Sequence, residues 1–471
     1  MSSETISSEP HIRPAIGLWD AVSIIVGIVV GTSIFRATAA IFDNAGSPAP
    51  AILLWIAGGV LAWCGAVCYA ELATSFPRDG GDYEYLNRAF GPWCGFLFAW
   101  AQITTVISGN IGIMAYVFAD YAGQVWPDLK NYTVALTAAP IVILSALNAL
   151  GVFAGKATQN FLTATKVIGL GGIVLAAAIT SAVPASQPQA ENAVHAESSA
   201  NLGLALVFVL YAYGGWQHAA YVAAEVRDER RNLPRALVLG IIGITIIYLI
   251  VNVAYLHALG FGAARLAKTP AADVLQQTCG PWGAKAISVL VMLSALGAIN
   301  GMILTGVRIY AVWGADYPAL RWLGTWNERR AAPTAAIALQ TIIALALVLL
   351  VGTSAGQTLF DTTLSLFGIA ALPWQKFPGG FEMLVAGSTP VFWFLCLMTG
   401  ISVFILRLSY PNADRPFTIP LFPLPAIAFC ATCIYMLKTS IDYAGGLTML
   451  GVVPLAVGVV AWAHCRTKAT R

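Results

Sequence analysis

The chain has 471 residues, of which 58% are hydrophobic and only 10% are charged, whereas a soluble domain carries about 25% charged residues. Together with a mean hydropathy of +0.76, this composition excludes a water-soluble protein and predicts an all-α polytopic membrane protein in a lipid bilayer. The net charge of +3 is too small to indicate nucleic acid binding. Long apolar blocks also exclude a transmembrane β-barrel, whose strands alternate over about ten residues.

Apolar stretches long enough to cross a membrane, about 20 residues each, recur from Ala15 almost to the C-terminus. Two segments between them, 261–280 and 353–388, are too short or too polar to span. We expect the first to form one or two small helices and the second an external or re-entrant loop. The twelve predicted transmembrane helices cover residues 15–42, 49–76, 92–122, 133–151, 158–183, 201–226, 235–260, 281–312, 333–352, 389–408, 417–437 and 446–464.

An even number of spans places both termini on the same side of the membrane. In this arrangement 17 Lys and Arg residues lie on the side of the termini and seven on the other, with Lys166 inside a span. The positive-inside rule therefore places both termini in the cytoplasm, in a multi-pass protein of an inner or plasma membrane.

Two of the predicted helices carry glycine clusters in their middles. The first reads VGIVVGTSIF, with Gly27 and Gly31, and the sixth reads YAYGGW, with Gly214 and Gly215. Glycines are also common where membrane helices pack closely, which is the alternative interpretation. Transporters built from inverted five-helix repeats break their first and sixth helices at the midplane. Since the two clusters lie five helices apart, we predict that both helices are broken.

A broken membrane helix creates a polar site. The freed N–H and C=O groups are tolerated at membrane depth only where they line a cavity or bind a ligand. The N-terminus of a half-helix favours an anion, and unwound carbonyl groups favour a cation. Two facing breaks are therefore suited to a zwitterion.

Several motifs are similar to those of a known family. The segment FPRDGGDYEYLNRAFGPWCGFLFAW (76–100) resembles the P-x-x-G-G-x-Y signature of the amino acid, polyamine and organocation (APC) transporters. YAYGGW, EVRDERRNLPRAL (225–237) and RPFTIPLFP (415–423) are similar to the L-type amino acid transporter branch. The resemblance implies a LeuT-like 5+5 fold with two added helices. Its parts are a cytoplasmic tail (1–14), a first repeat (15–183), an external loop (184–200), a second repeat (201–408), helices 11 and 12 (409–464) and a second cytoplasmic tail (465–471).

The resemblance also assigns substrate-binding residues at the two breaks. Backbone N–H groups of helix 1 would receive the substrate carboxylate, and helix 6 would offer its carbonyls to the ammonium group. Two positions depart from the family, which usually has G-S-G-I-F where this chain has GTSIF, and a phenylalanine where this chain has a tyrosine in YAYGGW. That tyrosine is implied to gate the site from outside, and a helix 7 tyrosine is implied to lie near it. The implied residues are Gly31, Thr32, Ser33, Tyr211, Ala212, Gly214, Gly215 and, on helix 7, Tyr248.

Lys166 is the one basic residue deep within a predicted span. A charge at membrane depth costs a few kcal/mol and is by default a functional candidate. The resemblance implies that this helix 5 lysine reaches the unwound part of helix 1, at a place that sodium fills in ion-coupled relatives, and so implies sodium-independent coupling. The alternative is a lysine that extends to the membrane interface.

The predicted function is sodium-independent exchange or facilitated transport of neutral amino acids, with small or medium apolar side chains. No carboxylate or arginine lies mid-span near the breaks to pair with a charged substrate side chain. A proton-coupled amino acid symporter is the alternative. An enzyme is not expected, because the spans lack clustered His, Asp and Glu, and neither a cofactor nor a metal is implied.

Three further expectations concern single residues. The loop 123–132 has no cysteine, whereas eukaryotic relatives use one there to bond to a glycoprotein heavy chain, so we expect no disulfide-linked heavy chain. We expect His218 to be a packing residue. Glu71 and Asp20 lie near cytoplasmic span ends, where we expect solvated charges. The alternative is an ion pair with a nearby arginine, namely Arg78, Arg88 or Arg308.

Overall fold

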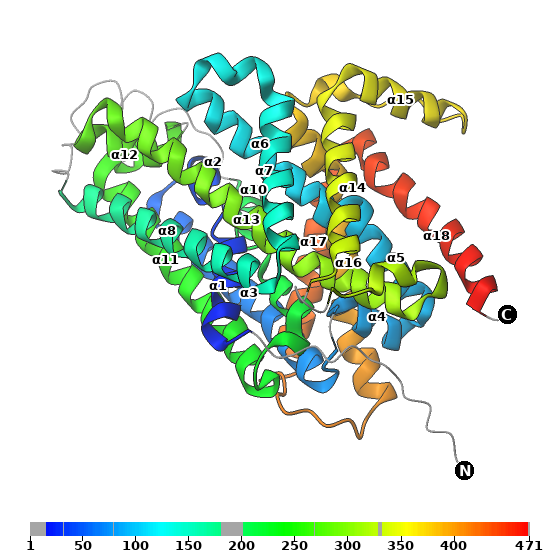
Figure 1. Ribbon diagram of the computed structural model, residues 1–471. Coiled ribbons are helices and arrows are strands. Elements are labelled where there is room, and N and C mark those ends of the chain that lie inside the picture. Colours follow the sequence, from blue (N-terminus) through cyan, green and yellow to red (C-terminus); the bar gives the residue numbers. More distant parts are fainter. Residues whose placement is uncertain are drawn as a thin grey trace, which may run out of the picture.

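The computed structural model describes residues 16–31, 33–78, 80–179, 201–267, 269–327 and 332–469, and these form a bundle of helices (Figure 1). The first half contains α1 (Leu18–Val29), α2 (Ser33–Ala45), α3 (Pro48–Ser75), α4 (Asp82–Phe90), α5 (Pro92–Ala101), η1 (Gln102–Val106), α6 (Ile107–Val125), η2 (Pro127–Tyr132), α7 (Thr133–Ala149) and α8 (Val152–Ile179). The second half contains α10 (Leu202–Ala212), η3 (Trp216–Glu225), α11 (Glu229–Leu266), α12 (Pro270–Cys279), α13 (Pro281–Asp316), η4 (Pro318–Gly324), α14 (Thr334–Gly352), α15 (Ser354–Ser365), η5 (Trp374–Lys376), α16 (Gly380–Ser409), α17 (Leu424–Ala444), η6 (Gly445–Thr448) and α18 (Met449–Ala469).

Nine helical segments of the described chain are long and apolar enough to cross a membrane. The first and sixth predicted spans are not among them, because each is divided into two short helices, α1 with α2 and α10 with η3. α17 and α18 follow one another through η6 and count as a single segment from Leu424 to Cys465. The chain is therefore a multi-pass helical membrane protein.

Short helices mark the two ends of the bundle. α12 and α15 lie at the top of Figure 1, whereas α4 and the loop between α16 and α17 lie at the bottom. The predicted small helices within 261–280 are present as the last turns of α11, kinked at Gly260, and as α12. We refer to the two ends as the α12/α15 end and the α4 end.

The segment 353–388 differs from the predicted loop. α15 is capped by Thr353, whose side chain accepts a hydrogen bond from the N–H of Gly356. Asp361 accepts hydrogen bonds from the N–H of Leu372 (3.0 Å) and the indole of Trp374 (2.9 Å), so its carboxylate holds the following loop against α15. α16 then begins at Gly380, nine residues before the predicted start.

Two clusters of buried apolar side chains form the core. One joins α1, α2, α10 and η3 to α3, α11 and α17, and the other joins α5 and α6 to α14 and the second half of α13. Lipid gives little hydrophobic driving force between helices, so close packing of small residues matters. At Gly58 of α3, for example, an added Cβ would lie 2.3 Å from Val209 of α10. The two broken helices thus pack within the first cluster.

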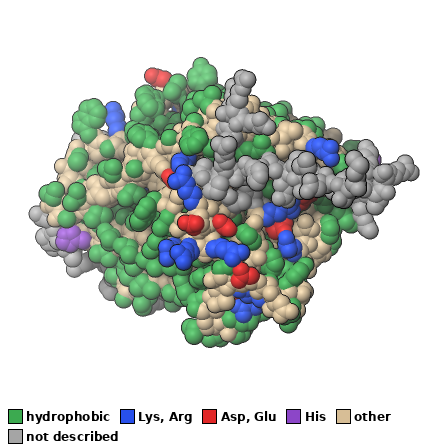
Figure 2. Space-filling view, turned by 60° about the horizontal axis from the view of Figure 1, so that its bottom comes forward, with side chains coloured by type: hydrophobic (Ala, Val, Ile, Leu, Met, Phe, Trp, Pro, Cys, Tyr) green, Lys and Arg blue, Asp and Glu red, His purple; other side chains and the backbone are tan. Residues whose placement is uncertain are grey.

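Charged side chains gather at the α4 end. Figure 2 shows Lys, Arg, Asp and Glu side chains in the middle of the face that includes this end, with hydrophobic side chains around them. Ion pairs at this end join elements distant in sequence, such as Arg78 with Asp316 at 2.6 Å and the buried pair Arg308 with Glu225 at 2.7 Å. These pairs join the helix ends at this side of the bundle.

Candidate functional site

The first helix is interrupted at Val30. This residue has φ −71° and ψ 72°, the geometry of an inverse γ-turn, and the N–H of Gly31 bonds the carbonyl of Val29 at 2.6 Å. In a continuous α-helix that N–H would instead reach the carbonyl of Gly27. The turn therefore removes the helical donor of the Gly27 carbonyl.

Lys166 supplies the missing donor. Its side chain on α8 is fully buried, and its Nζ donates to the Gly27 carbonyl at 2.6 Å. On the other side of the break, the hydroxyl of Ser294 on α13 donates to the carbonyl of Val30 at 3.3 Å. Freed backbone groups need such partners at membrane depth, so α8 and α13 stabilise the broken conformation of helix 1.

A polar stripe on α8 continues this contact toward the α4 end. Thr163 donates to the carbonyl of Ser23 at 3.1 Å, and Asn160 and Lys156 both bind the carboxylate of Asp20, at 2.8 Å and 3.0 Å. The expectation that Asp20 is a solvated charge is therefore wrong. Its partners lie one helical turn apart on a helix about 140 residues away in the sequence.

The sixth helix is interrupted between α10 and η3. Gly215 has φ +114°, a conformation that side chains disfavour, and its N–H donates to Oε1 of Gln217 at 3.1 Å. The hydroxyl of Tyr248 on α11 lies 2.9 Å from the carbonyl oxygens of both Val29 and Ala212. Because one residue contacts both breaks, the two unwound segments face one another.

A cavity of about 110 Å³ lies between the two breaks. Five of the seven predicted binding residues line it: Gly31, Ser33, Tyr211, Gly214 and Gly215. Ala212 is buried behind the wall with its carbonyl next to Tyr248, and Thr32 lies outside the described residues. Lys166 and Tyr248 support the breaks from outside the cavity lining.

Other lining residues were not assigned from the sequence. Gln217, Ser388 and Thr389 line the cavity, and so does His218, which was expected only to pack. The predicted tenth span, 389–408, excludes Ser388 and has Thr389 as its first residue, whereas α16 begins at Gly380 and carries both residues well inside the helix. The polar sequence AGSTP within an apolar stretch is the signal that could have identified them.

A larger cavity of about 610 Å³ adjoins the first at the α12/α15 end. It lies among α2, α10, the start of α16 and the end of α17, and it shares Ser33, Tyr211 and Thr389 with the central cavity. Tyr211 therefore lies between the two spaces.

The α4 end is closed beneath the central cavity. Ile16, before α1, pairs with the segment after η3 through two hydrogen bonds, from its N–H to the carbonyl of Glu225 and from the N–H of Arg227 to its carbonyl, both 2.9 Å. The Glu225 side chain binds Arg308 at 2.7 Å, with both side chains 3% exposed. These contacts join the residue before α1 and the end of η3 to each other and to α13.

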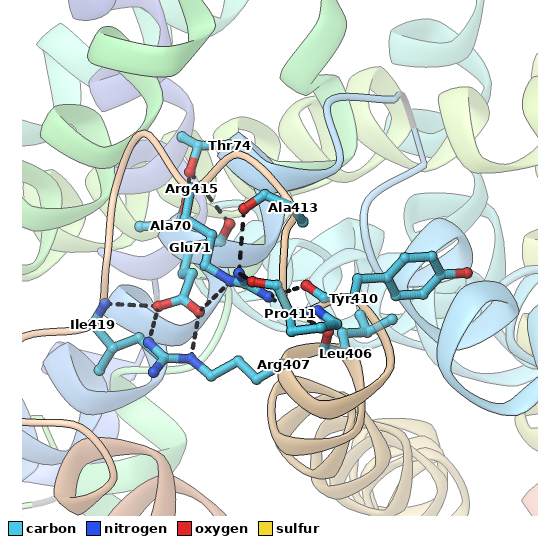
Figure 3. Close-up of polar contacts among 10 residues, drawn as sticks. All are labelled: Ala70, Glu71, Thr74, Leu406, Arg407, Tyr410, Pro411, Ala413, Arg415 and Ile419. Carbon is cyan, nitrogen blue, oxygen red and sulfur yellow. Dashed lines mark hydrogen bonds and ion pairs between the residues drawn. The ribbon is translucent and has the colours of Figure 1, made fainter.

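Glu71 is buried in a second ion-pair cluster at this end (Figure 3). Its carboxylate accepts hydrogen bonds from Nε and Nη2 of Arg407, at 2.7 Å and 2.5 Å, and from the N–H of Ile419 at 2.7 Å, while Arg415 lies 3.8 Å away. Glu71 is therefore neither solvated nor paired with Arg78, Arg88 or Arg308. The cluster ties the end of α3 to the loop between α16 and α17.

Asp82, at the start of α4, is a buried carboxyl group without a cationic partner among the described residues. Tyr69 donates to its Oδ1 at 2.5 Å, Thr399 donates to the same oxygen, and Tyr221 also hydrogen-bonds the group. Burial raises its pKa to about 6, although the three hydroxyls favour the ionised form. The group thus joins α3, α16 and η3 at a site where charge is disfavoured.

We expect this burial to make stability depend on pH. Between about pH 4, where an unfolded aspartate titrates, and pH 6, the folded protein binds more protons, so folding stability is lost as pH rises through this window. The loss is about 3 kcal/mol. Thermal unfolding in detergent should show this loss of stability with rising pH in the parent protein. Asp82→Asn should remove the pH dependence, because the carboxamide keeps an oxygen that accepts hydrogen bonds but does not titrate. Asp414→Asn, at an exposed carboxylate, is the matched control; equal pH dependence in parent and Asp82→Asn would contradict this prediction.

Comparison with known proteins decides the family. The family profile described as amino acid permease matches residues 16–463, nearly the whole chain. The chain belongs to the amino acid permease family. The b(0,+)-type amino acid transporter 1 of Mus musculus is similar, with 27% identity over 92% of this chain and 83% of the relative; the Oryctolagus cuniculus protein of that name is 30% identical over 72% and 71%. Large neutral amino acids transporter small subunit 2 of Homo sapiens is 28% identical over 96% and 82%.

The predicted resemblance to APC transporters of the L-type branch is thereby confirmed. The permease is a membrane transporter by family, not an enzyme, and its relatives are amino acid transporters. Among the residues that the structure describes, no group of three His, Cys, Asp or Glu side chains could hold a metal ion.

We expect Gly215→Ala to impair ligand binding by this permease. An added Cβ would lie 2.7 Å from Ile28 of the opposite break, and the positive φ adds about 1 to 3 kcal/mol of backbone strain. Gly243→Ala on α11, where an added Cβ meets nothing within 4 Å, is the control. Amino acid binding to purified protein should fall at least about tenfold in Gly215→Ala only. Unchanged binding would mean that the left-handed turn is not needed.

Proposed function

We propose that this permease carries neutral L-amino acids across the membrane by sodium-independent exchange or facilitated transport, through alternating access. The observation that carries the proposal is the pair of facing breaks around one cavity, with unwound backbone from helices 1 and 6 on its wall. N–H groups at Thr32 and Ser33 receive the carboxylate next to Gly31, and carbonyls at Tyr211 and Gly214 receive the ammonium group, with Gly215 making room between them. In this conformation the other two proposed groups have partners within the protein, because the N–H of Gly31 bonds Val29 and the carbonyl of Ala212 bonds Tyr248.

The arrangement of the fold follows the same reasoning. We infer twelve transmembrane helices in a LeuT-like 5+5 inverted repeat, with repeats at 15–183 and 201–408 and two added helices. Cytoplasmic termini make the α4 end the inside and the α12/α15 end the outside. The 610 Å³ cavity is then the external vestibule, Tyr211 its gate, and the Ile16 pairing with Glu225 and Arg227 the closed inner side.

Sodium independence rests on Lys166. Its buried Nζ lies 2.6 Å from a carbonyl that the break frees, so the lysine side chain occupies a place where a coupled cation would otherwise be coordinated. Neutral substrates are supported by the cavity wall, since no Asp, Glu, Lys or Arg belongs to the described lining.

A proton-coupled symporter is the second candidate, and Asp82 favours it. A buried carboxyl group with a pKa of about 6 at the inner gate can gain and lose a proton near physiological pH. In that case protonation would accompany opening toward the cytoplasm.

Counterflow in proteoliposomes tests both candidates. Purified protein is reconstituted with internal alanine, leucine, lysine or glutamate, and uptake of each labelled amino acid is measured with and without sodium and with and without a pH gradient. Exchange of neutral amino acids at the same rate with and without sodium, and with and without the pH gradient, supports the first proposal. Uptake driven by the gradient supports the second, and no exchange of any amino acid would overturn both.

We also propose that the permease works without a disulfide-linked heavy chain in the cell membrane. Among the described residues no cysteine forms a disulfide within the chain, and only Cys279 is exposed. Electrophoresis of native membranes without reductant should give the mass of the single chain, and a larger species that reductant collapses would contradict this.

A further inference from the structure

Besides Ser33 and Tyr211 at the two breaks, the wall of the central cavity carries five uncharged polar side chains from three further elements. They are Asn110 on α6, Gln217 and His218 on η3, and Ser388 and Thr389 on α16. The absence of charged residues near the breaks in the sequence favours apolar substrate side chains. The hydrogen-bonding groups of the cavity lead to a different expectation.

His218 is held in one orientation with a defined proton. Its Nδ1 lies 2.7 Å from Oγ1 of Thr305, and that hydroxyl donates its only proton to the carbonyl of Gly301 at 2.8 Å. With the Thr305 proton on the Gly301 carbonyl, Nδ1 carries the hydrogen and acts as the donor to Thr305. In the uncharged imidazole, Nε2 is then a hydrogen-bond acceptor. Tyr221 packs edge-on against the ring, with centroids 5.1 Å apart, and fixes its position.

The other polar residues are oriented in the same way. Gln217 accepts from the N–H of Gly215 through Oε1, which leaves its NH₂ group as a donor. The hydroxyls of Ser388 and Thr389 donate to the carbonyls of Leu384 and Val385, at 2.7 Å and 2.6 Å, so that their oxygens remain as acceptors. The cavity wall thus offers both acceptors and a donor whose directions are already set by the protein.

The volume of the cavity limits the size of the side chain. About 110 Å³ is less than the roughly 150 Å³ of an apolar cavity that holds benzene. A site built to hydrogen-bond a substrate group discriminates against an isostere that lacks the group, because its own polar atoms then stay unpaired. An apolar side chain of the same size would be such an isostere.

We propose that the permease selects neutral amino acids with a short hydrogen-bonding side chain, a hydroxyl or a carboxamide, and that His218 is the specificity-determining acceptor. This inference rests on the proposed transport of neutral amino acids. It concerns the substrate side chain, whereas the two backbone breaks bind the carboxylate and the ammonium group.

Threonine and valine provide the direct comparison, because they have nearly the same shape and differ by a hydroxyl. We expect the parent protein to exchange threonine with about tenfold higher affinity than valine, as one buried hydrogen bond provides. Serine and asparagine should exceed alanine and leucine in the same assay. Equal affinities for threonine and valine would overturn the inference and leave neutral amino acid transport standing, whereas exchange of no amino acid would overturn the transport proposal itself.

Variants locate the preference. In His218→Leu we expect the threonine-to-valine affinity ratio to fall to about one, and in His218→Gln, which keeps an acceptor, part of the preference should remain. His257→Leu changes an exposed histidine on α11 and should keep the parent ratio. A tenfold preference that persists in His218→Leu would overturn the role of His218. If His218→Leu does not fold, the parent ratio and the His218→Gln ratio still decide the question.

Discussion

Replacing Lys166 with alanine is expected to lower substrate affinity by about 5- to 150-fold and to reduce the exchange rate in proportion. The Gly27 carbonyl has lost its helical donor to the turn at Val30, and Lys166 donates to it at 2.6 Å. Removing the ammonium leaves a buried acceptor unpaired, at a cost of about 1 to 3 kcal/mol. That cost falls on the broken conformation of helix 1, which presents the proposed carboxylate site.

The measurement is affinity and initial rate of exchange in proteoliposomes, with and without sodium. Lys156→Ala is the matched control on the same helix, because it removes a lysine that binds Asp20 at the α4 end rather than the break. We expect the control to keep affinity within about threefold, since its ion pair is partly exposed. Parent affinity in Lys166→Ala would show that the lysine is a packing residue, and sodium independence would then need another basis.

The sequence was informative where a residue type conflicts with its surroundings. A lysine in an apolar span and two glycine clusters in long helices stand out against lipid, because each has a cost that only a specific partner offsets. Lys166, Gly31 and Gly215 could therefore be identified without coordinates. The γ-turn at Val30 could not, since valine itself carries no signal for leaving the helix.

Ion pairs between segments distant in the chain could not be predicted from the sequence. The partner of Glu71 lies 336 residues away on α16, and a carboxylate near a span end looks the same whether it meets water or an arginine from another helix. Helix ends were missed for a related reason. α16 extends to Gly380 because Pro390 and the small polar residues before it are tolerated inside a packed membrane helix, although they lower the local hydropathy.

The ion pair of Glu71 is expected to control stability asymmetrically. Arg407→Met should destabilise the permease by about 3 kcal/mol, because it leaves a buried carboxylate with only the Ile419 N–H and the more distant Arg415. Glu71→Gln should cost less, since the freed Arg407 side chain is 25% exposed and can turn to water, whereas that of Glu71 is 4% exposed and cannot.

The double variant Glu71→Gln with Arg407→Met decides between charge and packing. If the uncompensated carboxylate causes the loss, neutralising it should recover at least about half of the stability lost in Arg407→Met. Arg407 also packs over the ring of Phe422, 3.7 Å from its centroid, and loss of that contact would persist in the double variant. Thermal unfolding of the four proteins in detergent gives the cycle. A double variant no more stable than Arg407→Met would show that Arg407 stabilises the protein by packing on the loop before α17. Neutralisation of the Glu71 charge would then make no contribution.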